Sequence, residues 1–208
     1  MSALGGDNRR RYEVAADCLE VSFEVKKSRF ITRAYPAASR DEAMAGLAQA
    51  KLDYPDARHH CWAYLIGNPH SPTTVAMNDD GEPSGTAGKP ILNVLQHKHI
   101  GDVMLVVIRY FGGIKLGAGG LVRAYSAAAQ QAMEALPVKT VVPMEAIRLQ
   151  GDYAFEQPLR HWLGGHDGRV DSVSYEGEVC FTVQLPHNSL ADFEAFCAAH
   201  GARLLAGV

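Results

Sequence analysis

The stretch VMLVVIRYFGGIKLGAGGLVRAY, Val103 to Tyr125, joins an apolar run to a glycine-rich segment and then to the start of a helical pattern. Residues 102–110 are mostly apolar without alternation, which is typical of a strand covered on both faces. Residues 121–136 are rich in alanine and place their apolar side chains on one helical face. The residues of that face are Leu121, Ala124, Tyr125, Ala128, Ala132 and Leu136. The stretch therefore predicts a buried strand, a glycine loop and a long helix.

Sequence patterns before this stretch predict further strands and helices of an α+β domain. Residues 20–25 alternate in polarity and residues 28–35 follow a short basic turn, so the two segments are expected to form a hairpin. Ser39 is expected to cap a helix that ends near Asp53, with Glu42 completing a capping box. The other elements predicted here are strands at 60–67 and 73–78 and a helix with Pro90 in its first turn.

The last third of the chain has its own order of elements. Its pattern is strand, helix, strand, strand, helix, strand, which is the ferredoxin-like order. The segments are 144–153, 155–163, 170–175, 178–185, 189–200 and 202–205. Pro137 and Pro143 bracket a linker that has room for a short strand. The sequence thus predicts two domains, 1–136 and 137–208.

Charge is distributed unevenly between these two parts. The 208 residues carry a net charge of −3, which argues against a protein that coats nucleic acid through bulk positive charge. Residues 1–136 hold 15 Lys and Arg against 14 Asp and Glu, whereas residues 137–208 hold 5 against 9. Any anion-binding surface is therefore expected to be a local patch in the first part.

The sequence is typical of a cytosolic protein. No window approaches the roughly 20 apolar residues that a membrane span needs, and the amino end does not have the pattern of a secretory signal. The four cysteines, Cys18, Cys61, Cys180 and Cys197, are far apart and form no C-x-x-C pair. Scattered single thiols favour a reducing cytosol over a disulfide framework or a zinc site.

Two glycine loops, 81–89 and 112–120, each stand before a predicted helix. Free backbone N–H groups and the helix dipole favour an anion at such a junction, and basic residues lie next to both loops. The alternative is structural: glycines also supply positive φ or tight packing, and single arginines often form surface ion pairs. Neither loop matches a P-loop or a dinucleotide fingerprint, so no nucleotide cofactor is expected.

The span from Gly88 to Gly117 resembles the signature of the IMPACT family, in its bacterial, YigZ-like branch. The matching residues are Gly88, Ile91, Leu92, Leu95, Ile100, Val106, Val107, Arg109, Tyr110, Phe111, Gly112, Gly113, Leu116 and Gly117. Further matches lie at 27–30, 56–60 and 79–90. The resemblance implies an amino-terminal domain with the ribosomal-protein-S5 domain-2-like fold. It also implies a carboxy-terminal ferredoxin-like domain similar to those of elongation factor G.

The same resemblance implies a link to translation. Eukaryotic members carry an RWD domain and restrain a kinase of a translation initiation factor by competing for the activator of that kinase. No RWD segment is recognisable in this sequence, so that role is not expected here. For bacterial members the family implies a link to nucleic acid or translation without an established reaction.

Several residues are candidates for metal binding or catalysis instead. Asp79, Asp80 and Glu82 are weak candidates for holding Mg²⁺, but Asn-Asp-Asp-Gly is also ordinary turn chemistry. A third option pairs one of these carboxylates with Arg109. His59 and His60 are neighbours on a predicted strand and should face opposite ways. No Ser-His-Asp or Cys-His arrangement is recognisable, so we expect no catalytic residue, no metal and no cofactor.

These patterns favour a non-enzymatic protein that binds RNA or a ribosome-associated or other translation partner and thereby regulates translation. A phosphate-handling or Mg²⁺-dependent hydrolase and a protein–protein adaptor remain open alternatives, as does the oligomeric state. The predicted partners include no membrane. The candidate nucleic-acid or anion-binding residues are Lys26, Lys27, Arg29, Arg58, His59, His60, Gly85, Thr86, Gly88, Lys89, Arg109, Tyr110, Gly112, Gly113, Lys115, Gly117 and Arg123.

Overall fold

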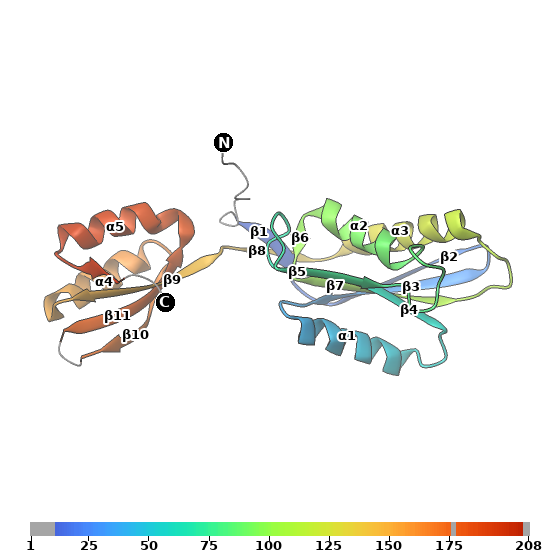
Figure 1. The fold of residues 1–208 in the computed structure, drawn as a ribbon, viewed down its shortest axis with the longest axis horizontal. Helices are drawn as coiled ribbons and strands as arrows, with labels where there is room; N and C mark the ends of the chain where they lie inside the picture. Colours follow the sequence, from blue (N-terminus) through green and yellow to red (C-terminus); the bar gives the residue numbers. More distant parts are fainter. Residues whose placement is uncertain (1–10, 176–177, 206–208) are drawn as a thin grey trace. The chain divides into compact units, whose positions relative to one another are not determined.

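The computed structural model describes residues 11–175 and 178–205 of the chain (Figure 1). Contacts divide the chain into two compact units, Met1–Val141 and Val142–Val208. The division falls later than the predicted boundary after residue 136, because strand β8 (Val138–Val141) pairs antiparallel with β1 (Tyr12–Ala15). The predicted linker therefore contributes a strand to the first unit.

The first unit is built on a five-stranded sheet with the order β2-β3-β7-β4-β5. Figure 1 shows α1 on one face of this sheet and α2 and α3 on the other. The strands are β2 (Leu19–Val25), β3 (Ser28–Pro36), β4 (His59–Ile66), β5 (Thr74–Asn78) and β7 (Val103–Tyr110). The helices are α1 (Arg40–Asp53), α2 (Gly88–Lys98) and α3 (Ala118–Ala135).

The central strand β7 is buried on both faces, which confirms the prediction from its apolar run. Met104, Val106 and Ile108 belong to the core on the α1 side. Val103, Leu105 and Val107 belong to the core under α2 and α3, together with the predicted inner face of α3. The apolar run therefore exists because two helical layers cover the strand.

Helix α1 begins with the predicted capping box. The Ser39 side chain accepts a hydrogen bond from the Glu42 backbone N–H at 3.2 Å. The Glu42 carboxylate accepts one from the Ala38 N–H at 2.8 Å. The helix ends at Asp53 as predicted.

A second, three-stranded sheet of the first unit has the order β6-β1-β8. Strand β6 (Ile100–Gly101) pairs parallel with β1. Strands β1 and β6 are not predicted from the sequence, because such short strands have too little periodicity to show in it.

The second unit is a four-stranded antiparallel sheet with the order β10-β11-β9-β12. Its helices α4 and α5 lie together on one face, and the apolar core lies between them and the sheet (Figure 1). The strands are β9 (Met144–Gly151), β10 (Arg169–Ser174), β11 (Val179–Pro186) and β12 (Arg203–Leu204). The helices are the short η1 (Tyr153–Phe155) and η2 (His187–Ser189), with α4 (Glu156–Gly164) and α5 (Leu190–Ala199). This order of strands and helices is the predicted one.

Within the described ranges, no helix combines the length and the apolar character that crossing a membrane requires.

Candidate functional site

Arg109, at the end of β7, is buried in an ion pair. Only 6% of the residue is exposed, and its Nη1 donates to Glu82 Oε1 at 2.6 Å. The guanidinium carbon lies 5.7 Å from the ring centroids of both Phe30 and Phe111. The structure thus agrees with the option in which a carboxylate of the first loop pairs with Arg109. A contact between Arg109 and an external phosphate does not fit this burial.

The Glu82 carboxylate belongs to a buried network that joins three parts of the first unit. Tyr125 Oη, on α3, donates to Glu82 Oε1 at 2.8 Å. Cys61 Sγ, on β4, lies 3.3 Å from Tyr125 Oη and 3.0 Å from the Asp79 carbonyl oxygen, and either oxygen can accept its single S–H hydrogen. Burial raises the pKa of the Cys61 thiol to about 12, so this thiol stays protonated and is no nucleophile near neutral pH.

Asp79 occupies the amino end of α2. Its carboxylate accepts hydrogen bonds from the backbone N–H groups of Gly85, Ala87 and Gly88, at 2.8, 3.0 and 2.8 Å. Burial acts to raise the pKa of Asp79, but the three N–H donors outweigh it and hold the pKa below its usual value. The free N–H groups predicted for the loop 81–89 are therefore taken by the protein's own carboxylate.

The Asp79→Asn variant is expected to cost about 1–2 kcal/mol of stability at pH 7, the usual value of a lost cap. An amide cannot accept all three bonds. Because the folded pKa of Asp79 is lowered, its contribution is complete above the unfolded pKa of about 3.9. It is lost as the pH falls through the folded pKa. Urea unfolding should show the wild type and the variant converging below about pH 4, and a constant gap would contradict this role.

The other two acidic candidates also serve internal contacts. Asp80 Oδ2 accepts from the His60 backbone N–H at 2.6 Å, and its Oδ1 lies 4.0 Å from Lys51 Nζ. Glu82 holds Arg109 and Tyr125 as described above. In the described parts of the chain, no group of three His, Cys, Asp or Glu residues could hold a metal ion.

The two adjacent histidines lie on opposite faces of β4. His59 is cross-strand from Arg109, and its ring Nδ1 lies 2.9 Å from the Asp80 carbonyl oxygen. His60 is cross-strand from Ile108 and is buried, and this burial lowers its pKa. Neither imidazole ring is therefore fully exposed, as a contact to an external anion would require.

The second glycine loop packs tightly on the β2–β3 turn. A Cβ at Gly112 would lie 1.9 Å from the backbone carbonyl of Lys27. The Gly112 N–H donates to Ser28 Oγ at 3.3 Å. Lys26 and Lys27 form the turn with φ of 46° and 64°, so their side chains start beside the glycine loop.

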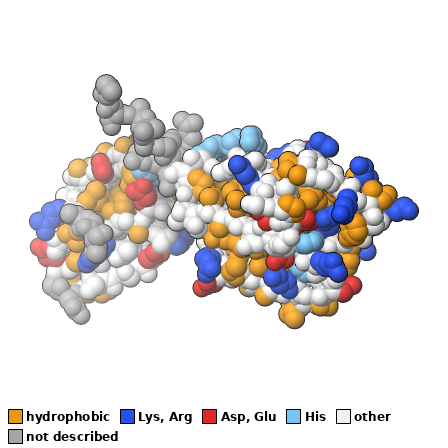
Figure 2. Space-filling model, turned by 45° about the vertical axis from the view of Figure 1, so that its right-hand side comes forward, with side chains coloured by type: hydrophobic (Ala, Val, Ile, Leu, Met, Phe, Trp, Pro, Cys, Tyr) orange, Lys and Arg blue, Asp and Glu red, His pale blue; other side chains and the backbone are white. Residues whose placement is uncertain are grey.

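Five cations surround this region: Lys26, Lys27, Arg29, Lys115 and Arg123 are all exposed. None of them takes part in an ion pair with the described residues. Figure 2 shows lysine and arginine side chains gathered toward one end of the first unit, with hydrophobic side chains between them. The cations are therefore available to an anionic partner.

The amino end of α3 differs from that of α2. Its N-cap is Gly117, with φ of 71°, and among the described side chains none caps this end. Its first turn contains no acidic residue and includes Gly119 and Gly120, which leave the backbone N–H groups accessible. Of the two predicted anion-binding helix ends, the one at α3 is open.

An exposed aromatic ring lies in the segment between β7 and α3. Phe111 is 55% exposed, whereas the predicted Tyr110 is half-buried and donates from its hydroxyl to Asp56 at 2.8 Å. Ile114 and Val122 are also exposed. Tyr110 is the predicted contact and Phe111 is not, because adjacent aromatic residues in a sequence do not show which of the two leaves the core. We name the residues Lys26, Lys27, Arg29, Phe111, Lys115, Arg123 and the amino end of α3 the loop surface.

The remaining predicted residues lie elsewhere or are structural. Thr86 is buried and donates to the Pro83 carbonyl at 2.6 Å, and Gly88 packs on the Asn78 backbone. Arg58 and Lys89 are exposed, but no described hydrogen bond or ion pair joins either to the loop surface. Gly85, Gly113 and Gly117 adopt positive φ, so each also has a conformational role.

Comparison with known proteins shows close relatives. The Impact N-terminal domain matches residues 26–133. The chain is 40% identical over 172 residues to the IMPACT family member YigZ of Escherichia coli, covering 83% of this chain and 84% of that protein. It is 44% identical over 184 residues to an IMPACT family member of Haemophilus influenzae, covering 88% and 89%.

A solved structure described as that of a hypothetical protein is similar over nearly the whole chain. It has a TM-score of 0.76 and 37% sequence identity, and the alignment covers 95% of this chain and 98% of that chain. The match of the domain to more than half of the sequence and the identity over most of the length of these relatives agree with each other. The chain belongs to the IMPACT family.

Proposed function

We propose that this protein is a cytosolic regulator of translation that binds RNA through the loop surface. Membership of the IMPACT family is consistent with a translation-related regulatory role. One observation carries the proposal: the amino end of α3 has no side-chain cap, and the cations of the loop surface have no ion-pair partner, among the described residues, whereas Asp79 fills the corresponding end of α2.

The chemistry of the loop surface fits a sugar–phosphate backbone. Lysine and arginine neutralise phosphates, and the amino end of a helix adds N–H donors and a favourable dipole. Phe111 supplies a ring on which a base can stack, with the Arg109 guanidinium beside it. Because Glu82 fixes Arg109, this platform is held in place without a partner.

We further infer that the two units are an S5 domain-2-like domain and a ferredoxin-like domain. For the second unit, the antiparallel order β10-β11-β9-β12 with both helices on one face supports the assignment. For the first unit, support comes from the family membership.

A non-enzymatic role is part of the proposal. The carboxylates on which a Mg²⁺-dependent hydrolase would depend already bind backbone N–H groups, Arg109 and Tyr125. Using them for a metal would require breaking these contacts. The exposed Ile114 and Val122 leave a protein partner as a possible outcome of the test below.

The test is fluorescence anisotropy of a labelled structured RNA over a salt series. Lys115→Gln with Arg123→Gln should reduce the slope of log K against log salt by about 1.5, because two phosphate contacts are lost. The matched control, Arg40→Gln with Lys139→Gln, removes two exposed cations outside the loop surface and should leave the slope unchanged. Phe111→Ala should weaken binding by about 1–3 kcal/mol per stacked base without changing the slope.

The variant Lys115→Gln with Arg123→Gln is called the loop variant. If it and its control bind RNA with the same affinity and the same salt slope, the loop surface does not contact RNA. Capture of a protein partner that survives nuclease and requires Ile114 would then support the adaptor alternative.

A further inference from the structure

The second unit concentrates its positive charge on one face of its sheet. Residues 142–208 contain four arginines and nine acidic residues. Arg160 lies on α4 and pairs with Glu156. The strand register places the other three, Arg148, Arg169 and Arg203, on the side of the sheet away from the helices. This unit is acidic as a whole and basic on that side.

The register defines this side residue by residue. Arg148 is cross-strand from Thr182, and Gln150 is cross-strand from both Cys180 and Arg203. Neighbouring positions such as Leu149 and Phe181 point to the apolar core instead. We name the outward set the open face: Ala146, Arg148, Gln150, Arg169, Ser172, Ser174, Cys180, Thr182, Gln184 and Arg203. The set contains no aromatic ring, but the Asp171 carboxylate, at the register shift between Val170 and Ser172, reaches this side and pairs with Arg169.

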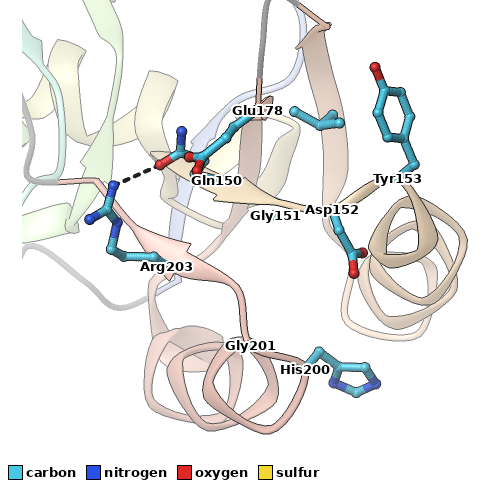
Figure 3. A pocket seen from close by; sticks show the side chains of 9 residues that line it. Gln150, Gly151, Asp152, Tyr153, Glu178, His200, Gly201 and Arg203 are labelled. Carbon is cyan, nitrogen blue, oxygen red and sulfur yellow. Dashed lines mark hydrogen bonds between the residues drawn. The ribbon is translucent and has the colours of Figure 1, made fainter.

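Two of its arginines are held in position by glutamines. Arg203 Nη2 donates to Gln150 Oε1 at 2.8 Å, and Figure 3 shows these side chains pointing toward one another. Arg169 Nη2 donates to Gln184 Oε1 at 2.6 Å. Among the described ion pairs, Arg169 is the only one of the three arginines that appears, at 3.1 Å from Asp171. Each guanidinium keeps further N–H donors for a partner.

Acidic groups limit the open face at one end. A cavity of about 650 Å³ lies there, lined by Gln150 and Arg203 and also by Asp152, Glu178 and His200 (Figure 3). The two carboxylates disfavour an anion inside the cavity. A polyanion is therefore confined to the strands, over a width of about 15 Å for four strands spaced about 4.8 Å apart.

We propose that the open face is a second contact for the sugar–phosphate backbone of RNA. Three arginines with serine, threonine and glutamine side chains match phosphate oxygens and 2′-hydroxyls. Without an aromatic ring to stack a base, the contact is independent of sequence. The inference rests on the proposed function for its ligand but on different residues. One RNA that reaches both surfaces gains affinity through effective concentration.

The experiment uses the full chain and the same labelled RNA. Arg148→Gln with Arg203→Gln should lower the salt slope by about 1.5 and weaken binding about tenfold near 0.15 M salt. Arg160→Gln, on the helical side, is the matched control and should bind as the wild type does. Unchanged melting temperatures would show that the variants fold, since all three arginines are exposed.

The outcomes separate the two proposals. If the loop variant weakens binding and the open-face variant matches the Arg160 control, the open face is no RNA contact while the proposed function stands. The reverse result would support the open face and refute the loop surface. If poly-glutamate displaces RNA from the open face as well as a second RNA does, the face recognises acidic protein instead and the inference fails.

Discussion

The Glu82→Ala variant is expected to lose about 3–5 kcal/mol of stability, the usual cost of leaving a buried charge without its partner. Arg109, which is 6% exposed and lies beside two aromatic rings, would keep only Ser28 Oγ at 3.5 Å as a side-chain hydrogen-bond partner in the described chain. Tyr125 would lose its acceptor at the same time. The melting temperature of the first unit should fall by roughly 10 °C.

The measurement has to report on the first unit alone. Trp62 lies on β4 of the first unit and Trp162 on α4 of the second. In a Trp162→Phe background, tryptophan fluorescence follows the unfolding of the first unit. Asp56→Ala is the control, because it removes an exposed carboxylate that accepts one hydrogen bond, from the Tyr110 hydroxyl, and should cost below about 1 kcal/mol.

A double variant tests the reason for the loss. Glu82→Gln with Arg109→Met removes both charges, so neither partner is left as an unpaired buried charge, and the amide oxygen that replaces the carboxylate still accepts from Tyr125. The double variant should therefore be more stable than Glu82→Ala. If Glu82→Ala unfolds within about 1 kcal/mol of the wild type, the ion pair contributes little and the burial of Arg109 needs another explanation.

This result also decides which residues can test RNA binding. An Arg109→Ala protein would lose stability whether or not it touches RNA. Lys115 and Arg123 are exposed and without ion-pair partners among the described residues, so a change in binding there can be assigned to the surface.

The sequence predicts the helices and most strands because each depends on local patterns. The apolar run of β7 and the capping box at Ser39 are contained within a few residues. Strands β1 and β6 could not be located in this way, because β1 pairs with residues near positions 100 and 140. The division after residue 141 depends on the same long-range pairing.

The candidate site was harder to predict than the fold. The two glycine loops look alike in sequence, and the difference between them comes from Asp79, which reaches three N–H groups up to nine positions later. Arg109 is buried because a carboxylate 27 positions earlier folds against it. Neither contact can be predicted from a local sequence pattern. The sequence therefore does not show which cations are exposed and which are paired inside the protein.

The Gly112→Ala variant is expected to destabilise the first unit by about 3 kcal/mol, the upper end of overpacking effects. The added Cβ would lie 1.9 Å from the carbonyl carbon and oxygen of Lys27 and 2.5 Å from the Ser28 nitrogen. These are backbone atoms, so no side-chain rotation can relieve the clash. The β2–β3 turn or the end of the β3–β7 pairing has to move.

Gly113→Ala is the matched control, one position further along the loop. No atom lies within 4 Å of its Cβ position, but its φ of 87° strains any side chain, which costs about 1–2 kcal/mol. In thermal unfolding followed by Trp62 fluorescence, Gly112→Ala should therefore have a lower melting temperature than Gly113→Ala. The reverse ranking would mean that the loop is not packed on the Lys26–Lys27 turn. The cations of the turn and of the loop would then have no fixed spacing, and a single RNA-binding surface could not be built from both.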